Sequence, residues 1–237
     1  MFVVVTPEWQ RFSFSEVSNA TNNVGVGLRG TYTSLEADVS LWGFQFENQS
    51  YPTSVIPTNG STVTRVAETC TGAGDASTFN DSEGVLMAEI SALHDGSDGN
   101  RYLSVNSGST TNSVRIYFGS VGDIQTVVTS SNATTSYMQY GGATISEINK
   151  IIITYSDSDF TLWVNGYQVA SDSRGTGATP IGLDRVNYNA GVGGTPFYGN
   201  TKQLQYFDST LTDAELETLT SWQSFLEMAN AQNYTII

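Results

Sequence analysis

Short apolar runs, each closed by polar turn residues, recur along most of this chain. From residue 84 onward, Gly, Asn, Asp and Ser cluster between the runs. Runs of this length with such boundaries are typical of β-strands, and their regular spacing favours a sandwich or a barrel. The pattern predicts strands at 84–90, 102–105, 114–118, 126–129, 151–155, 160–164, 167–170 and 202–207.

The segment around Asn165-Gly166 predicts a β-hairpin. Asn-Gly between two apolar runs supplies the two positive-φ residues of a type I′ turn, and this turn fixes the register of the flanking strands. Because side chains alternate across a strand, each cross-strand pair occupies one face of the sheet. The predicted pairs are Val164 with Tyr167 and Leu162 with Val169 on the core face, and Trp163 with Gln168 on the other.

A short helix is predicted at about 213–220. Thr212 can cap its N-terminus, and Glu215, three residues later, completes a capping box. Leu211 before the cap can pack against Leu216 as a hydrophobic staple.

Two phrases in this region carry a family resemblance. DFTLWVNGYQV at 159–169 and FYGNTKQLQYFDSTLTDAELETL at 197–219 resemble the concanavalin A-like lectin/glucanase superfamily, specifically its laminin-G-like branch. The resemblance implies an all-β fold at 83–222, an antiparallel β-sandwich of jelly-roll type with a short C-terminal helix. It does not fix the function, because this fold serves lectins, glycosidases, receptor modules and spacers.

The N-terminal part contains strand phrases of a different kind. Residues 8–14, 39–47, 51–58 and 61–65 resemble the C-terminal part of the carbohydrate-binding-module-like jelly rolls found in phage structural proteins. The resemblance implies a partial second β-sandwich at 1–62, a linker or crossover at 63–82 and a C-terminal tail at 223–237. Alternating strand phrases place Trp9 and Trp42 in the core of the partial sandwich.

The opening strands of that partial sandwich have no counterpart before Met1. Exposed apolar strands require partners. We therefore expect either that another protein or a second copy of this chain completes the sheet, or that the natural protein begins further upstream.

Charge and composition exclude several classes of protein. The chain has 23 Asp and Glu against 9 Lys and Arg, a formal net charge of −14, which repels the phosphates of nucleic acids. No apolar run approaches the ~18 residues of a membrane-spanning helix. Cys70 is the single cysteine, so the fold depends on packing rather than on intrachain disulfides.

No enzyme signature is found. A retaining glucanase needs two carboxylates about 5 to 5.5 Å apart, and such pairs come from acidic residues that alternate along one strand. The segment between Glu83 and Glu89 contains no carboxylate, and Asp157 and Asp159 lie in a predicted turn. His94 is the single histidine, and no serine has a nucleophile-elbow sequence around it.

One loop offers ligands for a metal ion. Asp95, Asp98 and Asn100 present oxygen donors at short spacing, and the laminin-G-like resemblance implies calcium at a rim of loops. The alternative is an ordinary Asp-Gly loop. A zinc site is excluded, because one Cys and one His do not make a tetrahedral set.

Glycan binding requires aromatic rings beside polar side chains, because a sugar presents C–H patches to a ring and hydroxyls to amides. The candidates are Trp163 with Gln168, Tyr188 beside Asn189, and Phe197-Tyr198. The alternative for Trp163 is cover by a neighbouring loop or helix, and for the others an ordinary structural role.

These observations predict a non-enzymatic structural protein of a phage virion, a head-fibre, decoration or tail-associated component on the outward-facing surface. Its expected partners are other virion proteins or copies of itself, with a glycan as a further candidate and without nucleic acid or membrane. The first alternative is a glycan-binding host adhesin, marked by exposed aromatics on one sandwich face. The second is a glycoside hydrolase or polysaccharide lyase domain, marked by a cleft with facing carboxylates.

Overall fold

The computed structural model describes residues 4, 6–14, 39–46, 54–63, 73–93, 99–172, 178–191, 195–222 and 227. The chain divides into two units, Met1–Ala67 and Glu68–Ile237. Among the described residues no helix has the length and hydrophobicity needed to cross a membrane.

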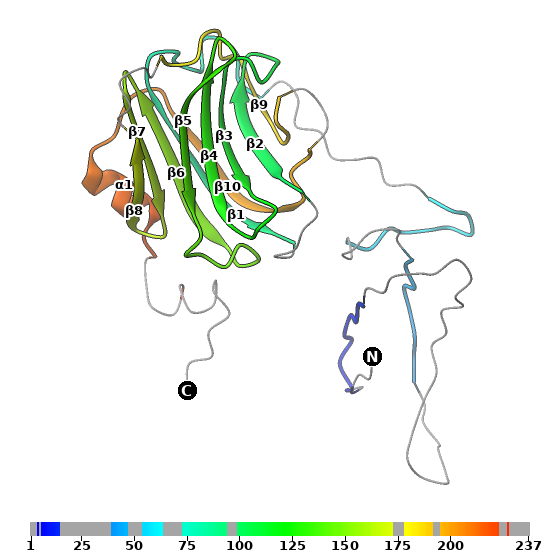
Figure 1. Ribbon diagram of the computed structural model, residues 1–237. Helices are drawn as coiled ribbons and strands as arrows, with labels where there is room; N and C mark the ends of the chain where they lie inside the picture. Colours follow the sequence, from blue (N-terminus) through cyan, green and yellow to red (C-terminus); the bar gives the residue numbers. More distant parts are fainter. Residues whose placement is uncertain are drawn as a thin grey trace. The chain divides into compact units, whose positions relative to one another are not determined.

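The second unit is a β-sandwich with one short helix (Figure 1). Its strands are β1 (Gly84–Ala92), β2 (Arg101–Asn106), β3 (Ser113–Phe118), β4 (Ile124–Ser130), β5 (Ala133–Tyr140), β6 (Asn149–Ser156), β7 (Asp159–Val164), β8 (Tyr167–Asp172), β9 (Arg185–Asn187) and β10 (Gly199–Phe207). The first sheet has the strand order β10-β1-β6-β7-β8, and the second sheet has the order β5-β4-β3-β2-β9. All the strand pairs are antiparallel, which confirms the predicted fold class.

The main core lies between the two sheets. Alternate residues of β1 and β6 in the first sheet, such as Leu86 and Ile153, pack with alternate residues of β3 and β4 in the second, such as Ile116 and Val128. Removing a buried side chain of this kind costs about 2 to 5 kcal/mol in other proteins, because the cavity that is left refills only in part. The apolar alternation seen in the sequence is therefore the main determinant of the sandwich.

A second, smaller cluster lies on the outer face of the first sheet. The helix α1 (Asp213–Thr220) places Leu216 over Val85, Met87, Ile152 and Trp163. Helix bounds, capping box and staple agree with the prediction, since Thr212 and Glu215 make the reciprocal bonds and Leu211 joins this cluster.

The hairpin between β7 and β8 forms the predicted turn, with φ of 50° at Asn165 and 91° at Gly166. Val164 pairs with Tyr167, and Trp163 with Gln168, as expected. The predicted pairing of Leu162 with Val169 is wrong, because a β-bulge shifts the register and Leu162 faces Ala170.

The strands predicted from residue 84 onward are all present, but β5 and β9 were not predicted. β5 is rich in Thr, Ser and Gln, and β9 is only three residues long. Part of the predicted linker belongs to the sandwich, since Phe79 packs into the main core and its ring meets Tyr206 edge-on at 4.9 Å between centroids. The boundary between the units falls after Ala67, within the segment 63–82 that was predicted as a linker or crossover.

The described stretches of the first unit contain no strand. Trp9 and Trp42 are 74% and 75% exposed, so the prediction that they form a core is wrong for this chain taken alone. The Gln45 side chain links two stretches, since its Oε1 accepts from Ile56 N at 2.8 Å and its Nε2 donates to Ser54 O at 3.2 Å.

Candidate functional site

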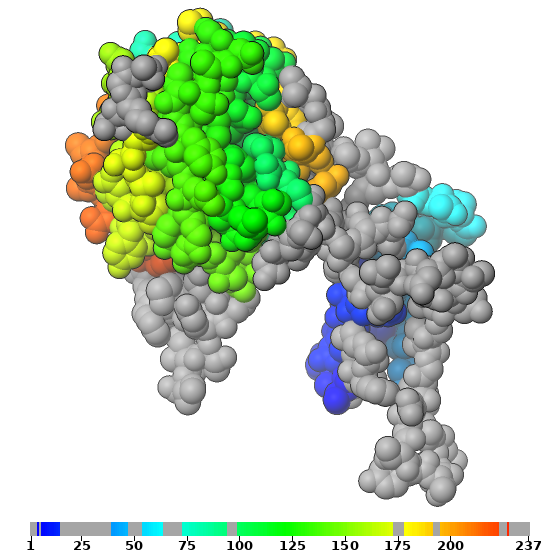
Figure 2. Space-filling view, viewed as in Figure 1, coloured from blue at the N-terminus to red at the C-terminus, as the bar shows by residue number. Residues whose placement is uncertain are grey.

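The outer face of the second sheet carries side chains that the fold does not need for its core. The strand register arranges these residues in three rows across the sheet. One row contains Gln139, Gln125, Tyr117 and Tyr102; the next contains Tyr137, Val127, Arg115, Ser104 and Asn187; the third contains Thr134, Thr129, Ser113, Asn106 and Arg185. In Figure 2 the green strands form a broad continuous surface, with α1 in orange at the edge of the view.

The alternation of β3 produces this face. Val114, Ile116 and Phe118 enter the main core, so Arg115 and Tyr117 must point to the other side of the sheet. A single strand thus supplies both the core and the site.

Arg115 is the cationic centre of the face. Its Nη2 donates to Thr129 Oγ1 at 2.8 Å, and its Cζ lies 5.8 Å from the centroid of the Tyr102 ring. Its Nε is buried and has no hydrogen-bond partner among the described residues. Burial lowers the pKa of Arg115 from its ordinary value while Tyr102 and Tyr117 oppose that shift, and a guanidinium remains charged at neutral pH.

Two stacked tyrosines lie beside Arg115, and Tyr102 is the one of this pair that is partly exposed. The rings of Tyr102 and Tyr117 stack with centroids 4.4 Å apart and an interplanar angle of 27°. Tyr117 is 5% exposed although it points away from the core, because its neighbours on this face pack around it. Burial, followed by the nearby Tyr102, raises the pKa of Tyr117 well above its ordinary value, so its hydroxyl stays protonated.

Asp123 anchors a hydrogen-bond network at the edge of the same face. It is buried, and its Oδ2 accepts from Gln125 Nε2 at 2.7 Å and from Gln139 Nε2. The Oε1 atoms of these two glutamines lie 3.0 and 3.1 Å from the hydroxyl of Tyr137. The network therefore joins a buried carboxylate to a partly exposed tyrosine.

The turn between β3 and β4 holds Asp123 in place. Gly119 N donates to Asp123 O at 2.9 Å, and a Cβ atom on Gly119 would collide with Asp123 Oδ1 and Gln125 Nε2. Glycine at this position thus leaves room for the carboxylate and for the amide that it orients.

The glycan-binding candidates chosen from the sequence lie outside this face of the second sheet. Trp163 is 6% exposed beneath α1, so its ring offers no face to a ligand, and the alternative of helix cover is correct. Gln168 is exposed on β8 of the first sheet. Tyr188 and Phe197 are partly buried against the main core, with ring centroids 6.0 Å apart, whereas Tyr198 is exposed.

Asn189 is the one of these candidates with a described bond to the outer face of the second sheet. Its backbone oxygen accepts from Ser104 Oγ at 2.8 Å, while its side-chain Oδ1 accepts from Gly191 N at 2.7 Å. These bonds give it a role in holding a loop at the edge of β2.

The calcium candidate falls mostly outside the described residues, which include neither Asp95 nor Asp98. Asn100 donates from Nδ2 to the Tyr102 hydroxyl at 2.9 Å, and its Oδ1 accepts from Ser120 N at 3.2 Å. In the part of the chain that the structure describes, no group of three His, Cys, Asp or Glu residues is close enough to hold a metal ion.

The carboxylates considered for catalysis have structural partners. Glu89 is buried on the outer face of the first sheet, and its Oε1 lies 2.7 Å from Lys202 Nζ. Glu83 accepts from the backbone and side chain of Thr210 at 3.1 and 2.9 Å. Neither faces the other as an acid–base pair would.

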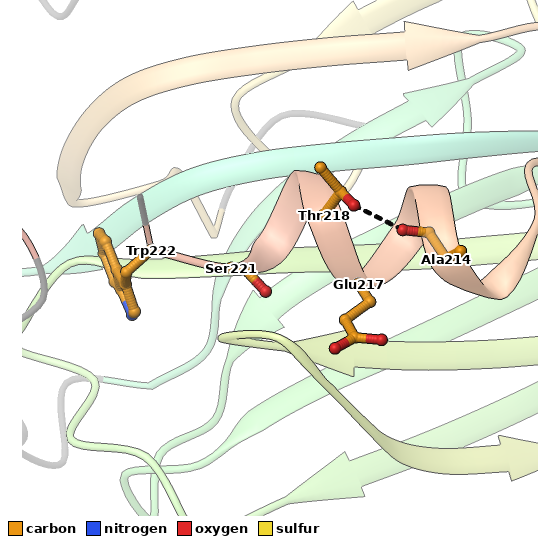
Figure 3. A pocket seen from close by; sticks show the side chains of 5 residues that line it. All are labelled: Ala214, Glu217, Thr218, Ser221 and Trp222. Carbon is orange, nitrogen blue, oxygen red and sulfur yellow. Dashed lines mark hydrogen bonds between the residues drawn. The ribbon is translucent and has the colours of Figure 1, made fainter. Parts of the chain in front are cut away.

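A shallow hollow lies along the end of α1 (Figure 3). It is lined by Ala214, Glu217, Thr218, Ser221 and Trp222, and Thr218 uses its hydroxyl to bond Ala214 O at 2.7 Å. Lys150 Nζ donates to Ser221 O at 2.9 Å and lies 4.6 Å from the Trp222 ring centroid, so this cation holds the end of the helix against β6.

Comparisons with known proteins support the fold class. No family profile matches the chain, and no curated protein sequence matches it. Among solved structures, the carbohydrate-binding module CBM40 of the Ruminococcus gnavus IT-sialidase, bound to α2,3-sialyllactose, aligns with a TM-score of 0.54 at 16% identity over 66% of this chain and 95% of that module. The same module bound to α2,6-sialyllactose aligns with a TM-score of 0.53 at 16% identity, over 65% of this chain and 95% of the module.

At this identity the likeness concerns the fold alone. It agrees with the predicted antiparallel β-sandwich, and both of these structures are of a carbohydrate-binding module.

Sequence reasoning missed the residues of the outer face. Tyr102, Arg115 and Tyr117 lie in strands that were predicted, and a charged residue between apolar neighbours marks a residue that points away from the core. Tyr137 and Gln139 lie in β5, which was not predicted. Strand order was also needed, since these residues meet only when β5, β4, β3 and β2 lie side by side.

Proposed function

We propose that the second unit is a glycan-binding module that binds an acidic sugar on the outer face of the second sheet. The observation that carries this proposal is Arg115, a partly exposed guanidinium whose Nη2 donates to Thr129 Oγ1 and which lies beside the partly exposed ring of Tyr102, itself stacked on Tyr117.

The chemistry of this face matches that of a sugar acid. Arginine is suited to carboxylates because its planar fork donates two parallel hydrogen bonds. Aromatic rings pack against the C–H patches of a sugar, and amide side chains bond its hydroxyls. Arg115, Tyr102 and Gln125 provide one group of each kind on adjacent strands.

The solved structures support the choice of ligand class without deciding it. The similar modules bind sialyllactose, which is an acidic oligosaccharide. We infer from the residues of this chain, rather than from that likeness, that a negative charge on the ligand would meet Arg115.

Arg115→Gln is the test, with Arg11→Gln in the first unit as the matched control. A glycan array of the intact protein should show binding to acidic glycans that falls at least about tenfold in Arg115→Gln, because a hydrogen bond to a charged group contributes about 1.5 to 3 kcal/mol. The control should bind like the wild type. Wild-type protein that binds no glycan, or Arg115→Gln protein that binds equally well, contradicts the proposal.

The reading as a phage virion component on an outward-facing surface remains a proposal that rests on sequence phrases. The comparisons favour the first alternative, a glycan-binding module. A glycan-binding module would suit either an adhesin or a virion component, so the proposed binding face is compatible with both interpretations.

A second proposed function concerns the first unit, which would associate with further copies of itself. It exposes Trp9, Trp42, Phe44 and Phe46 by 71% or more. Soluble monomers rarely expose large apolar groups so densely, and such groups mark association surfaces.

A further inference from the structure

The outer face of the second sheet is polarised, with donors at one end and acceptors at the other. Arg115 can only donate hydrogen bonds, and a carboxylate such as Asp123 can only accept them. Arg115 therefore binds ligand groups that accept hydrogen bonds. The network built on Asp123 must bind ligand groups that donate them.

Asp123 fixes the orientation of two amides. Because its Oδ2 accepts only, both Gln125 and Gln139 must turn their NH₂ groups toward it, with the N–O distance 2.7 Å for Gln125. Their Oε1 atoms then point toward Tyr137, at 3.0 and 3.1 Å from its hydroxyl oxygen. The assignment of oxygen and nitrogen in each amide thus follows from the carboxylate.

The Tyr137 hydroxyl cannot donate a hydrogen bond to both glutamine oxygens at the same time. The Tyr137 hydroxyl has one proton, yet two amide oxygens converge on it, and each of those oxygens can accept two hydrogen bonds. Burial and the nearby Asp123 raise the pKa of Tyr137, so the hydroxyl stays neutral and cannot supply more. One carbonyl is always left without the tyrosine proton.

The oxygens of the two glutamines can accept further hydrogen bonds, and they are accessible to a ligand. Gln139 is exposed, Gln125 is partly exposed and Tyr137 is 39% exposed. Arg115 and Gln125 are diagonal neighbours on β3 and β4, which places their backbones about 7 to 8 Å apart. One sugar residue with its substituents can span such a distance.

We propose that the oxygens of Gln125, Gln139 and Tyr137 form an acceptor subsite that binds hydroxyl or amide N–H donors of the same sugar whose acidic group meets Arg115. This inference rests on the proposed function and deepens it. It makes the glutamines specificity-determining residues, because a sugar without donors at that end would leave their oxygens desolvated and unpaired.

The experiment compares the methyl glycoside of α2,3-sialyllactose, which has no free reducing end, with the same compound after mild periodate oxidation and borohydride reduction, which shorten the glycerol chain of the sialic acid and remove hydroxyl donors. Calorimetry with the intact protein gives the affinities. The truncation should weaken wild-type binding by about tenfold, as expected for lost hydrogen bonds with unpaired acceptors left behind.

Gln125→Met and Gln139→Met keep the side-chain length and remove the acceptor. Each should bind the intact trisaccharide about tenfold more weakly and show little further loss on truncation. Gln203→Met, an exposed glutamine of β10 in the first sheet, is the control and should behave like the wild type. Melting temperatures establish that each variant is folded, and either glutamine variant alone is sufficient for the comparison.

The outcomes separate the two proposals. If the wild type binds α2,3-sialyllactose and both glutamine variants retain its affinity or its sensitivity to truncation, the acceptor subsite is wrong and the glycan-binding function stands. Binding to other array glycans without binding to this trisaccharide overturns the subsite in the same way. Failure to bind any glycan overturns both.

Discussion

At the scale of single residues, two charges are placed on one sheet face without neutralising each other. Arg115 and Asp123 both lie near Tyr117, and each has its own polar neighbours, Thr129 for the cation and the glutamines for the anion. Burial of a charge is expensive unless it is paired and hydrogen-bonded. Incompletely paired charges in an otherwise well-packed sandwich are typical of binding sites, which fold stability alone would not retain.

Buried tyrosines predict a loss of stability at alkaline pH. Burial raises the pKa of Tyr117, Tyr155 and Tyr206 above the ordinary value of 10.0. In the unfolded chain these hydroxyls lose their protons near that value, whereas the folded chain retains them. Above pH 10.0 the unfolded state therefore binds fewer protons, and the free energy of unfolding falls as the pH rises.

Denaturant unfolding at a series of pH values from neutral to strongly alkaline measures this effect. The contribution is fully present below the ordinary tyrosine pKa and is lost progressively as the pH rises from that value through the raised pKa of the folded chain. Tyr155→Phe should show a smaller alkaline loss, because it removes one of the titrating groups. A free energy of unfolding that stays constant through the tyrosine titration contradicts the prediction.

At the scale of elements, the β7–β8 hairpin depends on the backbone of its turn. Gly166 has a φ of 91°, and a Cβ atom there would lie 2.9 Å from Ser221 Oγ. Gly166→Val should lower the free energy of unfolding by more than about 1 kcal/mol, since a β-branched residue resists positive φ. Gly141→Val is the control, because Gly141 has no positive φ and nothing within 4 Å of an added Cβ.

Thermal and denaturant unfolding of the two glycine variants test this turn. An unchanged melting temperature in Gly166→Val would show that the turn tolerates a side chain. The predicted loss of unfolding free energy at this type I′ turn would then be wrong. Equal losses in both variants would point instead to a general effect of valine on the sandwich.

Local signals made some elements predictable and others not. The hairpin and α1 were predictable because Asn165-Gly166 and Thr212 with Glu215 act within a few residues of sequence. β5 was missed because its polar residues alternate with few apolar ones and so lack the usual strand pattern. The β-bulge between the pairs of Leu162 and Trp163 was missed because the extra residue lies in β8, whose sequence contains no glycine or proline to mark it.

The candidate site shows the same limit on a larger scale. Arg115 could have been identified as outward-facing from its place in β3, but its neighbours Tyr102 and Tyr137 come from strands whose positions depend on the sheet order. Trp163 was a reasonable candidate until the helix that covers it was placed. A site made of residues from four strands is a property of topology, so periodicity within one strand does not reveal it.

At the scale of the whole molecule, charge is unevenly divided between the two units. The first unit, Met1–Ala67, holds only five of the 23 acidic residues and three of the nine basic ones. The second unit therefore carries most of the net charge of −14. Like charges keep the sandwiches of different copies apart, whereas the nearly neutral, aromatic first unit meets little repulsion when copies associate.

We expect the intact protein to form oligomers through this first unit. Trp42, Phe44 and Phe46 are exposed by 75%, 71% and 81%, and burying such rings between copies removes a large apolar area from water. Copies of one chain offer the simplest partner, because a self-complementary patch serves every subunit. Association would also place several of the proposed sugar sites on one particle, which would raise the avidity for a glycan surface without any new contact at each site.

Light scattering of the intact protein at several concentrations tests this expectation. The wild type should have a mass above that of one 25.5 kDa chain, and replacing Trp42, Phe44 and Phe46 together by Ser should shift it toward the monomer while the melting transition of the sandwich stays unchanged. Val121→Ser, which changes an exposed apolar residue of the second unit, is the control and should not alter the mass. A wild-type monomer whose residues 39–46 resist hydrogen exchange would show that the first unit folds without a partner and would exclude association as its function. An oligomer that persists after the triple substitution would show that the copies associate through a surface other than this aromatic one. If that surface lies in the second unit, its contacts must overcome the repulsion between the acidic sandwiches.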